Sequence, residues 1–558
     1  MQQRYDYIVV GAGSAGCVLA NRLSADPSCS VLLVESGPAD RDPMIRMPRG
    51  IGKLLVAGNR HVWDYRIEPG NDQPSELWLK GRTLGGSSSI NGMVYVRGAP
   101  ADYDAWEAAG CTGWGWSDIG RQFVALEDHV LGAADGRGVG GPLKVTIHPS
   151  GSPLCEAVIE AAQQSGTPRV ADTNHVDTVE QGAFGYQPQN TWNGQRFSAA
   201  RAFLDPVRSR PNLSILTSTD VVKINFDGTR ATSVSIREKT GLREIGIGRE
   251  VILSAGAIES PKLLQLSGVG PAALLREHGI AVVADRAQVG QNLREHLCLP
   301  LQYRVRSGSL NYAFRGLGLL GSLWSYYVRG SGPLTHAAHE AGGFVKTRAD
   351  AERADAQIGV SLHSLTVKAN NQVVPEKEHG LTFYCYFTRP ESRGEVAIAS
   401  ADPAVAPRIS ANYLSAQIDR DSAVSLIRWV RQLVAQPALE PLVVSEEVPG
   451  ARYQSDAELL DAARQIGRTA YHVSCTCRMG SDDDAVLDPE LRVKGVSGVR
   501  VVDTSIMPSL PSGNTNAPAM AIALRAAEII TGRQADGQHM PTSPVTVSSP
   551  VSELSSHS

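Results

Sequence analysis

The stretch YDYIVVGAGSAG, residues 5–16, decides the fold of this chain. Residues 7–10 form a short apolar run rich in β-branched side chains, which is typical of a buried parallel strand. The run leads into the spacing G-x-G-x-x-G, made by Gly11, Gly13 and Gly16. Residues 14–24 then continue as a helix pattern. In such a unit the first glycine permits the tight turn, the second lets a pyrophosphate approach the backbone, and the third lets helix and strand pack closely.

The next strand-like run, residues 31–34, ends at Glu35. A carboxylate at this distance from the glycine turn is placed to accept hydrogen bonds from a ribose hydroxyl. The sequence therefore predicts a Rossmann-like α/β domain that binds a dinucleotide, the alternative being a doubly wound fold without a nucleotide. The fingerprint alone does not distinguish NAD from FAD.

The 558 residues are enough for two domains, and a net charge of -4 gives no support for a nucleic-acid surface. The most apolar segment, residues 317–328, is too short and glycine-broken to span a membrane, so we expect a buried or interfacial helix there. The nucleotide strand begins close to Met1, so we expect no secretory signal and a cytoplasmic protein, with association at the inner membrane surface left open. Eight scattered cysteines, including Cys475 and Cys477, are expected to be incidental thiols, and no metal site is expected.

Farther along the chain, residues 81–92 are rich in Gly and Ser and suit an anion or a flat heterocycle. A strand-like run at 250–253 precedes Ser260 and Pro261, which we expect to be the N-cap and the first residue of a helix. Strand-like runs at 383–387 and 394–399, with a helix at 423–435, indicate a different, sheet-and-helix domain. We therefore expect a discontinuous nucleotide domain, a substrate-binding α+β domain and a disordered tail, with these boundaries: 1–300 with 466–533, 301–465, and 534–558.

These segments together resemble the glucose–methanol–choline (GMC) family of FAD-dependent oxidoreductases over residues 5–532, and its choline dehydrogenase-like and bacterial alcohol dehydrogenase members in particular. The motifs that carry the resemblance are GAGSAGCVLANRLS (11–24), GRTLGGSSSINGMVYVRG (81–98), SAGAIESPKLLQLSGVGP (254–271), YHVSCTCRMG (471–480) and VVDTSIMPSLPSGNTNAPAM (501–520). The resemblance implies that the glycine turn holds the ADP part of FAD.

The resemblance also assigns cofactor contacts by position. The residues that match family FAD contacts are Gly11, Gly13, Gly16, Glu35, Gly85, Ser87, Asn91, Gly92, Val222, Asp503, Asn514, Ala517 and Pro518. Some members attach FAD covalently to a histidine in the segment that corresponds to 81–98. This segment contains no histidine here, so we expect non-covalent FAD.

The resemblance points to FAD-dependent oxidation of a primary alcohol to the aldehyde. His472 matches the catalytic histidine of the family, and a histidine has the right pKa to accept the hydroxyl proton. Asn516 is expected as the second catalytic residue, which orients the substrate oxygen, and as the N-cap of a helix with Pro518 in its first turn.

Two further residues are candidates for the substrate site. Glu340 matches a position that faces the trimethylammonium group in choline oxidases, and His363 is placed in the same cavity. The expected electron acceptor is quinone-like, with O2, as in an oxidase for choline or for aryl or furanic alcohols, as the alternative. A redox-neutral lyase or decarboxylase of the same fold is the other alternative. Peripheral membrane contact and the oligomeric state stay open.

Overall fold

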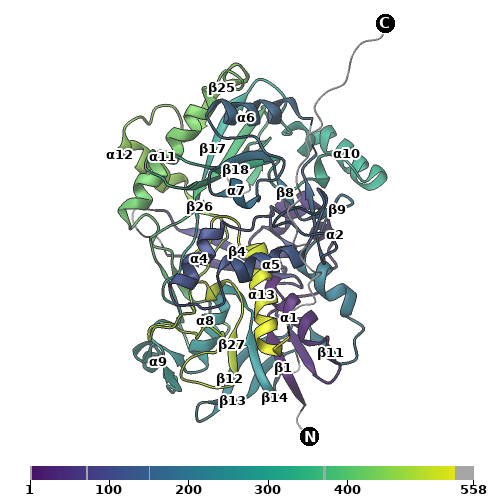
Figure 1. The fold of residues 1–558 in the computed structure, drawn as a ribbon, viewed down its shortest axis with the longest axis vertical. Coiled ribbons are helices and arrows are strands. Elements are labelled where there is room, and N and C mark those ends of the chain that lie inside the picture. Colours follow the sequence, from purple (N-terminus) through teal and green to yellow (C-terminus); the bar gives the residue numbers. More distant parts are fainter. Residues whose placement is uncertain are drawn as a thin grey trace, which may run out of the picture.

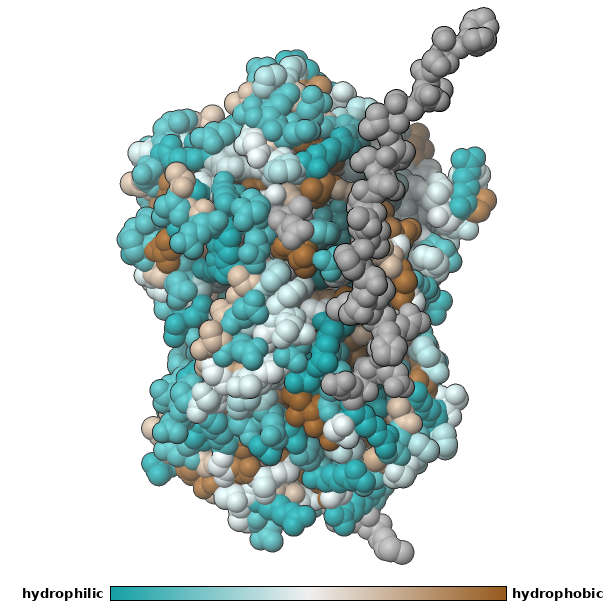
Figure 2. Space-filling model, in the orientation of Figure 1, coloured by the Kyte–Doolittle hydropathy of each residue, from teal (hydrophilic) through white to brown (hydrophobic). Residues whose placement is uncertain are grey.

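Two layers, each built around its own sheet, are stacked along the long axis of the molecule (Figure 1). In this computed structural model the described residues are 3–68, 70, 73–149, 151–239, 241–367 and 373–533. The expected disordered tail, 534–558, lies outside them. Figure 2 shows one face of the molecule, on which hydrophilic residues predominate and hydrophobic ones form small separate groups.

The lower layer in Figure 1 contains the nucleotide-type sheet. Its strands, in spatial order, are β11 (Leu213–Leu216), β2 (Val31–Val34), β1 (Arg4–Val10), β14 (Gly241–Leu253), β13 (Arg230–Glu238) and β12 (Asp220–Asp227), and β27 (Val499–Val501) also pairs with β14. Four pairs are parallel: β1 with β2, β1 with β14, β2 with β11, and β14 with β27. All four residues of β2 are buried, as a parallel strand covered on both faces requires. The expected doubly wound domain is confirmed.

The glycine turn after β1 is sterically determined. Gly11 has a φ of +96°, and a Cβ there would lie 2.6 Å from the carbonyl oxygen of Ser254. At Gly16 a Cβ would lie 1.9 Å from the carbonyl oxygen of Gly11, so only glycine lets helix α1 (Ser14–Leu23) pack this close to the turn. Helix α13 (Asn516–Thr531) packs beside α1.

The helix expected to start at Ser260 starts earlier. Helix α8 spans Gly256–Leu266, and Pro261 lies inside it. A proline removes one backbone donor, which would leave the carbonyl of Ala257 without its helical partner. The hydroxyl of Thr476 donates to that carbonyl at 2.7 Å, which explains how the helix tolerates Pro261.

The upper layer contains the second sheet and the helices that cover it. Its strands, in spatial order, are β25 (Val443–Val448), β17 (Leu297–Val305), β22 (Gly380–Phe387), β19 (Ala356–Ser361), β18 (Ala341–Val345) and β7 (Ala183–Tyr186), and β26 (Arg468–Thr469) also pairs with β17. Its helices include α6 (Pro153–Gln164), α11 (Gln417–Val434) and α12 (Asp456–Ile466). The expected domain boundary needs correction here, because β7 pairs with β18 and α6 packs on α11, although both lie within 1–300.

The segment expected to form a buried or interfacial helix is a projecting surface helix, so only the buried alternative is wrong. Helix α10 (Gly316–Trp324) and the π-helical turn after it, Ser325–Arg329, stand out from the upper layer (Figure 1). Leu317 is 77% exposed and Leu320 62% exposed. Among the described helices, none is both long and apolar enough to cross a membrane.

Candidate active site

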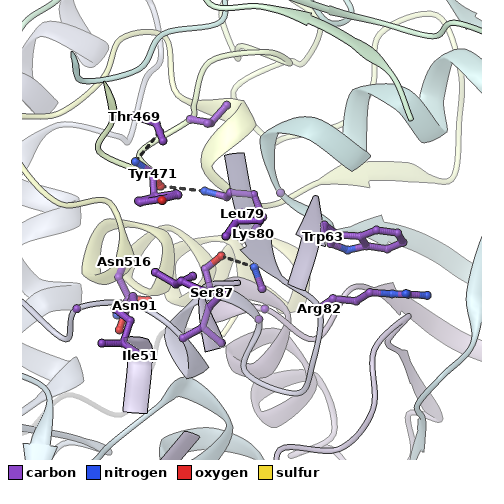
Figure 3. Close-up of a pocket in the computed structure, with 18 of the residues that line it drawn as sticks. Ile51, Trp63, Leu79, Lys80, Arg82, Ser87, Asn91, Thr469, Tyr471 and Asn516 are labelled. Atoms are coloured by element: carbon purple, nitrogen blue, oxygen red, sulfur yellow. Dashed lines mark hydrogen bonds between the residues drawn. The ribbon is translucent and has the colours of Figure 1, made fainter. Parts of the chain in front are cut away.

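A single cavity of about 2130 Å³ lies where the two layers meet, and Figure 3 shows part of it. Of the residues predicted from the sequence, those that line it are Gly11, Gly13, Glu35, Ser87, Asn91, Gly92, Val222, His363, His472, Asp503, Asn514 and Asn516. Its described lining does not include Gly16, Gly85, Ala517, Pro518 or Glu340. The cavity is therefore continuous from the predicted nucleotide site to the predicted catalytic site.

Glu35 marks the nucleotide end of the cavity. Its carboxylate accepts hydrogen bonds from the backbone N–H groups of Ala12 at 2.9 Å and Gly37 at 2.8 Å. Burial raises the pKa of Glu35 to about 7, although both backbone donors act against that rise. Val222, on β12, lines the same end of the cavity.

The backbone between Glu35 and His472 leaves open space at two glycines. A Cβ at Gly13 would have no protein atom nearer than 3.9 Å, and one at Gly256 would have none within 4 Å, so both glycines leave their side of the backbone open to the cavity. This is where the fingerprint places a pyrophosphate, at the N-terminus of α1. The residues present fit the cofactor.

The glycine- and serine-rich segment packs tightly against this region. Gly85 has a φ of +85°, and its N–H donates to the carbonyl of Ala12 at 2.8 Å. The hydroxyl of Ser87 accepts from the N–H of Gly81 at 3.1 Å (Figure 3). The side chain of Asn91 is held by Arg196, whose Nη1 donates to its Oδ1 at 2.8 Å. Gly85 and Gly16 therefore shape the backbone, whereas Ser87, Asn91 and Gly92 face the cavity.

Helix α13 begins at the cavity, but its expected cap is wrong. Thr515 is the N-cap, without a side-chain cap bond, and Asn516 is the first helical residue. The Oδ1 of Asn516 accepts from the hydroxyl of Ser14 at 2.7 Å, which ties the starts of α13 and α1 together. Asp503 accepts from the N–H of Gly256 at 2.9 Å. Two helix N-termini thus point their positive ends at one cavity, where they favour negative charge.

At the opposite end lies His472, which is 6% exposed. Its Nδ1 is 2.9 Å from Nδ1 of His296, and its Nε2 is 3.1 Å from Nδ2 of Asn514. The other ring nitrogen of His296, Nε2, is 2.9 Å from the carbonyl oxygen of Thr388. A hydrogen-bonded row therefore runs from the Thr388 carbonyl through both imidazoles to Asn514.

This row fixes the tautomer of His472. A carbonyl can only accept, so Nε2 of His296 carries the proton and, in the neutral ring, its Nδ1 accepts. Nδ1 of His472 is then the donor, which leaves a lone pair on its Nε2. Burial lowers the pKa of His296 to about 4 and holds the pKa of His472 well below its ordinary value. The neighbouring imidazole of His296 and the charge of Lys80 lower the pKa of His472 further.

Asn514, not Asn516, is the amide beside His472, which corrects the sequence-based pairing. The Oδ1 of Asn514 accepts from Nε2 of Gln357 at 3.0 Å, so its Nδ2 is turned toward the imidazole. The hydroxyl of Tyr386 donates to Oε1 of Gln357. The ring of Tyr386 stacks on the ring of His296, with the centroids 4.6 Å apart. Asn514 is thus held rigidly in the orientation in which it donates.

The loop that carries His472 is held by buried charge. Tyr471 has a φ of +66°, a rare backbone conformation for a large residue. Its N–H donates to the hydroxyl of Thr469 at 2.8 Å, and Nζ of Lys80, on β4 (Glu76–Gly81), donates to its carbonyl at 2.8 Å (Figure 3). The carboxylate of Glu295 accepts from the N–H of His472 at 2.8 Å. Burial raises the pKa of Glu295 to about 7, and Lys80 opposes that rise.

The residues that position His472 are not marked as such in the sequence: they are His296, Gln357, Tyr386, Glu295 and Lys80. They lie on four segments far apart in the chain, and none belongs to a motif with its own spacing. Tyr384 and Tyr386 did carry a weak signal, since they alternate on one face of a predicted strand.

Of the two expected substrate residues, only His363 faces the cavity. Its ring packs against Phe314 with centroids 5.4 Å apart. The side chain of Glu340 is only 1% exposed and is ion-paired with Arg49, and Glu340 is not among the residues that line the cavity. Glu340 also lies near His148 and His336, with ligand atoms within 4.8 Å of one another. The guanidinium on its carboxylate works against a metal cation there.

Comparisons with known proteins identify the family of this chain. Family models described as GMC oxidoreductase match residues 5–298 and 390–523. An alcohol dehydrogenase [acceptor] of Pseudomonas putida is 41% identical over 94% of this chain and 95% of its own. An oxygen-dependent choline dehydrogenase of Ectopseudomonas mendocina is 42% identical, covering 96% of this chain and 95% of its own.

The solved structure of a pyridoxine 4-oxidase from "Mesorbium loti" superposes with a TM-score of 0.85 at 32% identity, covering 95% of this chain and 100% of that one. The family models span more than half of the chain, and the relatives align along almost their whole length. The chain therefore belongs to the GMC oxidoreductase family, as an FAD-dependent oxidoreductase that acts on CH–OH groups.

Proposed function

We propose that the protein oxidises a primary alcohol to the aldehyde, with His472 as the base and Asn514 as the group that holds the substrate oxygen. Nε2 of His472 accepts the hydroxyl proton, while Nδ2 of Asn514 donates a hydrogen bond to the same oxygen. Non-covalent FAD, when bound, supplies the hydride acceptor. The residues that would hold it include Glu35, Asn91 and Asp503.

The observation that carries the proposal is the row from Thr388 through His296 to His472. Because that row places the lone pair of His472 on the nitrogen beside Asn514, a hydroxyl bound between them meets one acceptor and one donor. An amide cannot take up a proton in this pH range, so His472 is the sole base.

The decisive experiment follows flavin reduction by an alcohol without oxygen, in a rapid-mixing instrument. His472→Ala should slow it about 10²–10⁴-fold, the usual contribution of a general base. Asn514→Ala should cost about 10²–10³-fold, as loss of one preorganised donor does. The matched control is Asn516→Ala, which removes one neutral hydrogen bond and should cost only about 2–12-fold.

Two results would contradict the proposal. Reduction by His472→Ala within a few-fold of the parent rate would remove His472 as the base. A flavin that no primary alcohol reduces would favour the redox-neutral alternative, a lyase or decarboxylase of the same fold.

A quinone-like acceptor is our choice over O2. The P. putida relative is named as acting with an acceptor, and other relatives are named oxygen-dependent or oxidases, so the names alone leave both routes. Turnover measured in parallel with air and with a soluble quinone, at equal flavin concentration, distinguishes them. Faster turnover in air would identify an oxidase.

Peripheral contact with the inner surface of the cytoplasmic membrane completes the proposal. The supporting feature is the segment 312–329, whose exposed apolar and aromatic residues are Tyr312, Leu317, Leu320, Trp324, Tyr327 and Val328. Arg315 and Arg329 flank helix α10, and the segment has no acidic residue. Leu319 and Leu323 on the same helix line the cavity, so an apolar quinone would pass directly from the lipid to the site.

A further inference from the structure

A buried ion pair stands at the wall of the substrate end of the cavity. Arg49 lies in the short 3₁₀ turn Pro48–Gly50 and lines the cavity, with its side chain 8% exposed. Its Nη2 donates to Oε1 of Glu340, whose side chain is 1% exposed and does not line the cavity. The positive partner of the pair therefore faces the substrate space, and the negative partner lies behind it.

Both carboxylate oxygens of Glu340 are already engaged by the protein. Its Oε2 accepts from the N–H of Leu362 at 2.9 Å, while Oε1 is held by Arg49. The backbone of Glu340 is fixed as well, because its N–H donates to the carbonyl of Val360 at 2.8 Å and its carbonyl accepts from Gln187 at 3.1 Å. The carboxylate cannot turn toward the cavity unless Arg49 leaves.

The pair belongs to the same wall as the catalytic residues. Nη1 of Arg49 donates to the carbonyl of Ala338 at 3.2 Å. The next residue, His339, packs against Tyr384 with ring centroids 5.1 Å apart. Tyr384 and Tyr386 project from the same face of β22, and the ring of Tyr386 lies 5.4 Å from that of His472. A substrate whose hydroxyl sits at His472 would extend along this wall toward Arg49.

The other described residues that line this end are apolar or neutral, apart from a second cation, Arg315, which follows Phe314. The guanidinium carbon of Arg49 lies 5.4 Å from the centre of the Phe314 ring, and Leu319, Leu323 and Leu334 also line the cavity. Burial lowers the pKa of His339 to about 3 and that of His363 well below its ordinary value, and the charge of Arg49 lowers both further. Both histidines are therefore uncharged near neutral pH. They neither add to the positive charge of Arg49 nor neutralise it.

We propose that Arg49 determines substrate specificity: by occupying Glu340 it excludes cationic alcohols, such as quaternary ammonium alcohols, and restricts the site to uncharged alcohols with an apolar body. A cation brought to this wall would meet a like charge in a site of low polarity and would find no free carboxylate. An uncharged alcohol of the same shape would pack against the Phe314 ring and the leucine side chains without that repulsion. The inference rests on the proposed oxidation of alcohols at His472.

The test uses two alcohols of nearly equal shape, choline and 3,3-dimethylbutan-1-ol, in which a carbon replaces the nitrogen. Anaerobic flavin reduction gives kcat/KM for each with the FAD-loaded enzyme. The parent should prefer the uncharged alcohol by at least about 10- to 150-fold, the factor that one charged contact supplies. Equal values for the two alcohols would overturn the role of Arg49, whereas a flavin reduced by neither would contradict the proposed function itself.

Two variants then separate Arg49 from Glu340. Arg49→Met frees the carboxylate and should move the preference toward choline by about tenfold or more. The matched control is Arg49→Met/Glu340→Gln, which keeps the space left by the arginine side chain but has no carboxylate at position 340. It should leave choline disfavoured. Arg49→Met leaves the carboxylate of Glu340 unpaired and could for that reason fail to bind FAD. In that case the preference between the two alcohols is compared in the parent and the double variant. Choline preferred by the double variant would overturn the proposal, since no carboxylate would explain it.

Discussion

His472 owes its chemistry to a carbonyl group two hydrogen bonds away. The Thr388 carbonyl sets the proton on His296, and His296 sets the lone pair of His472. Both imidazoles are buried, so neither gains a proton readily from solvent. A single backbone acceptor thus selects which nitrogen of the proposed base lies beside Asn514.

The lowered pKa of His472 predicts an unusual pH profile. The base is active when unprotonated, so activity is lost as the pH falls through the folded-state pKa, which burial holds well below the ordinary value of about 6.5. We therefore expect the anaerobic kcat/KM for flavin reduction to stay constant from pH 8 down to about 6.5 and to decline only at lower pH. Retention of FAD over the same range is the control. A decline that begins near pH 7.5 would contradict the assigned environment of His472.

At the scale of single residues, the sequence indicated which residues line the cavity better than which of them lie next to one another. His472 and Glu35 could be named as candidates because each stands in a motif or at a fixed distance from one, and both line the cavity. The choice between Asn514 and Asn516 depends on where α13 begins, and a shift of the helix start by one residue decides which amide faces the imidazole. His296 could not be predicted, since only the tertiary fold brings it next to His472.

Among the elements, the strands were predicted more reliably than the helix ends. Buried runs such as β1 and β2 have no alternative in so apolar a sequence. Ser260 and Pro261 have the ideal chemistry of a helix start, yet α8 begins at Gly256. The hydroxyl of Ser260 instead donates to Asp503 at 2.6 Å, and Thr476 satisfies the carbonyl that Pro261 leaves free. Partners distant in sequence override the local signal.

Helix α10 carries a prediction of its own, membrane binding through its exposed face. Leu317→Asp/Leu320→Asp should weaken binding to vesicles with anionic lipid by at least about tenfold, because each buried leucine side chain contributes about 1.5–3 kcal/mol. The melting temperature should not change, since both side chains are exposed. Leu242→Asp is the matched control, as Leu242 is 73% exposed but lies on β14 in the other layer. Cosedimentation with vesicles measures the difference, and parent protein that stays in the supernatant would contradict the contact.

At the scale of the whole molecule, the cavity joins the two layers. Its lining comes from the nucleotide sheet, as at Gly11 and Glu35, and from the upper sheet, as at Tyr384. The division into a discontinuous nucleotide domain and a covering domain was foreseeable from the change of pattern along the chain. The excursion of α6 and β7 into the upper layer was not, because strand pairing between distant segments leaves no periodic signal.

A cofactor that fills this cavity should hold the layers together and yet be removable. No histidine stands in residues 81–98, so acid should release FAD and leave colourless protein.

The protein freed of FAD should melt at a lower temperature, because a ligand that binds only the folded state stabilises it by about 2.7 kcal/mol at a hundred times its dissociation constant. Adding FAD back should restore the melting temperature in a concentration-dependent way. ADP, which reaches only the Glu35 end, should restore less, and calorimetry with both ligands measures the difference. Yellow colour retained in the acid-precipitated protein would show a covalent link, and identical melting curves with and without FAD would show that the layers are held by their protein contacts alone.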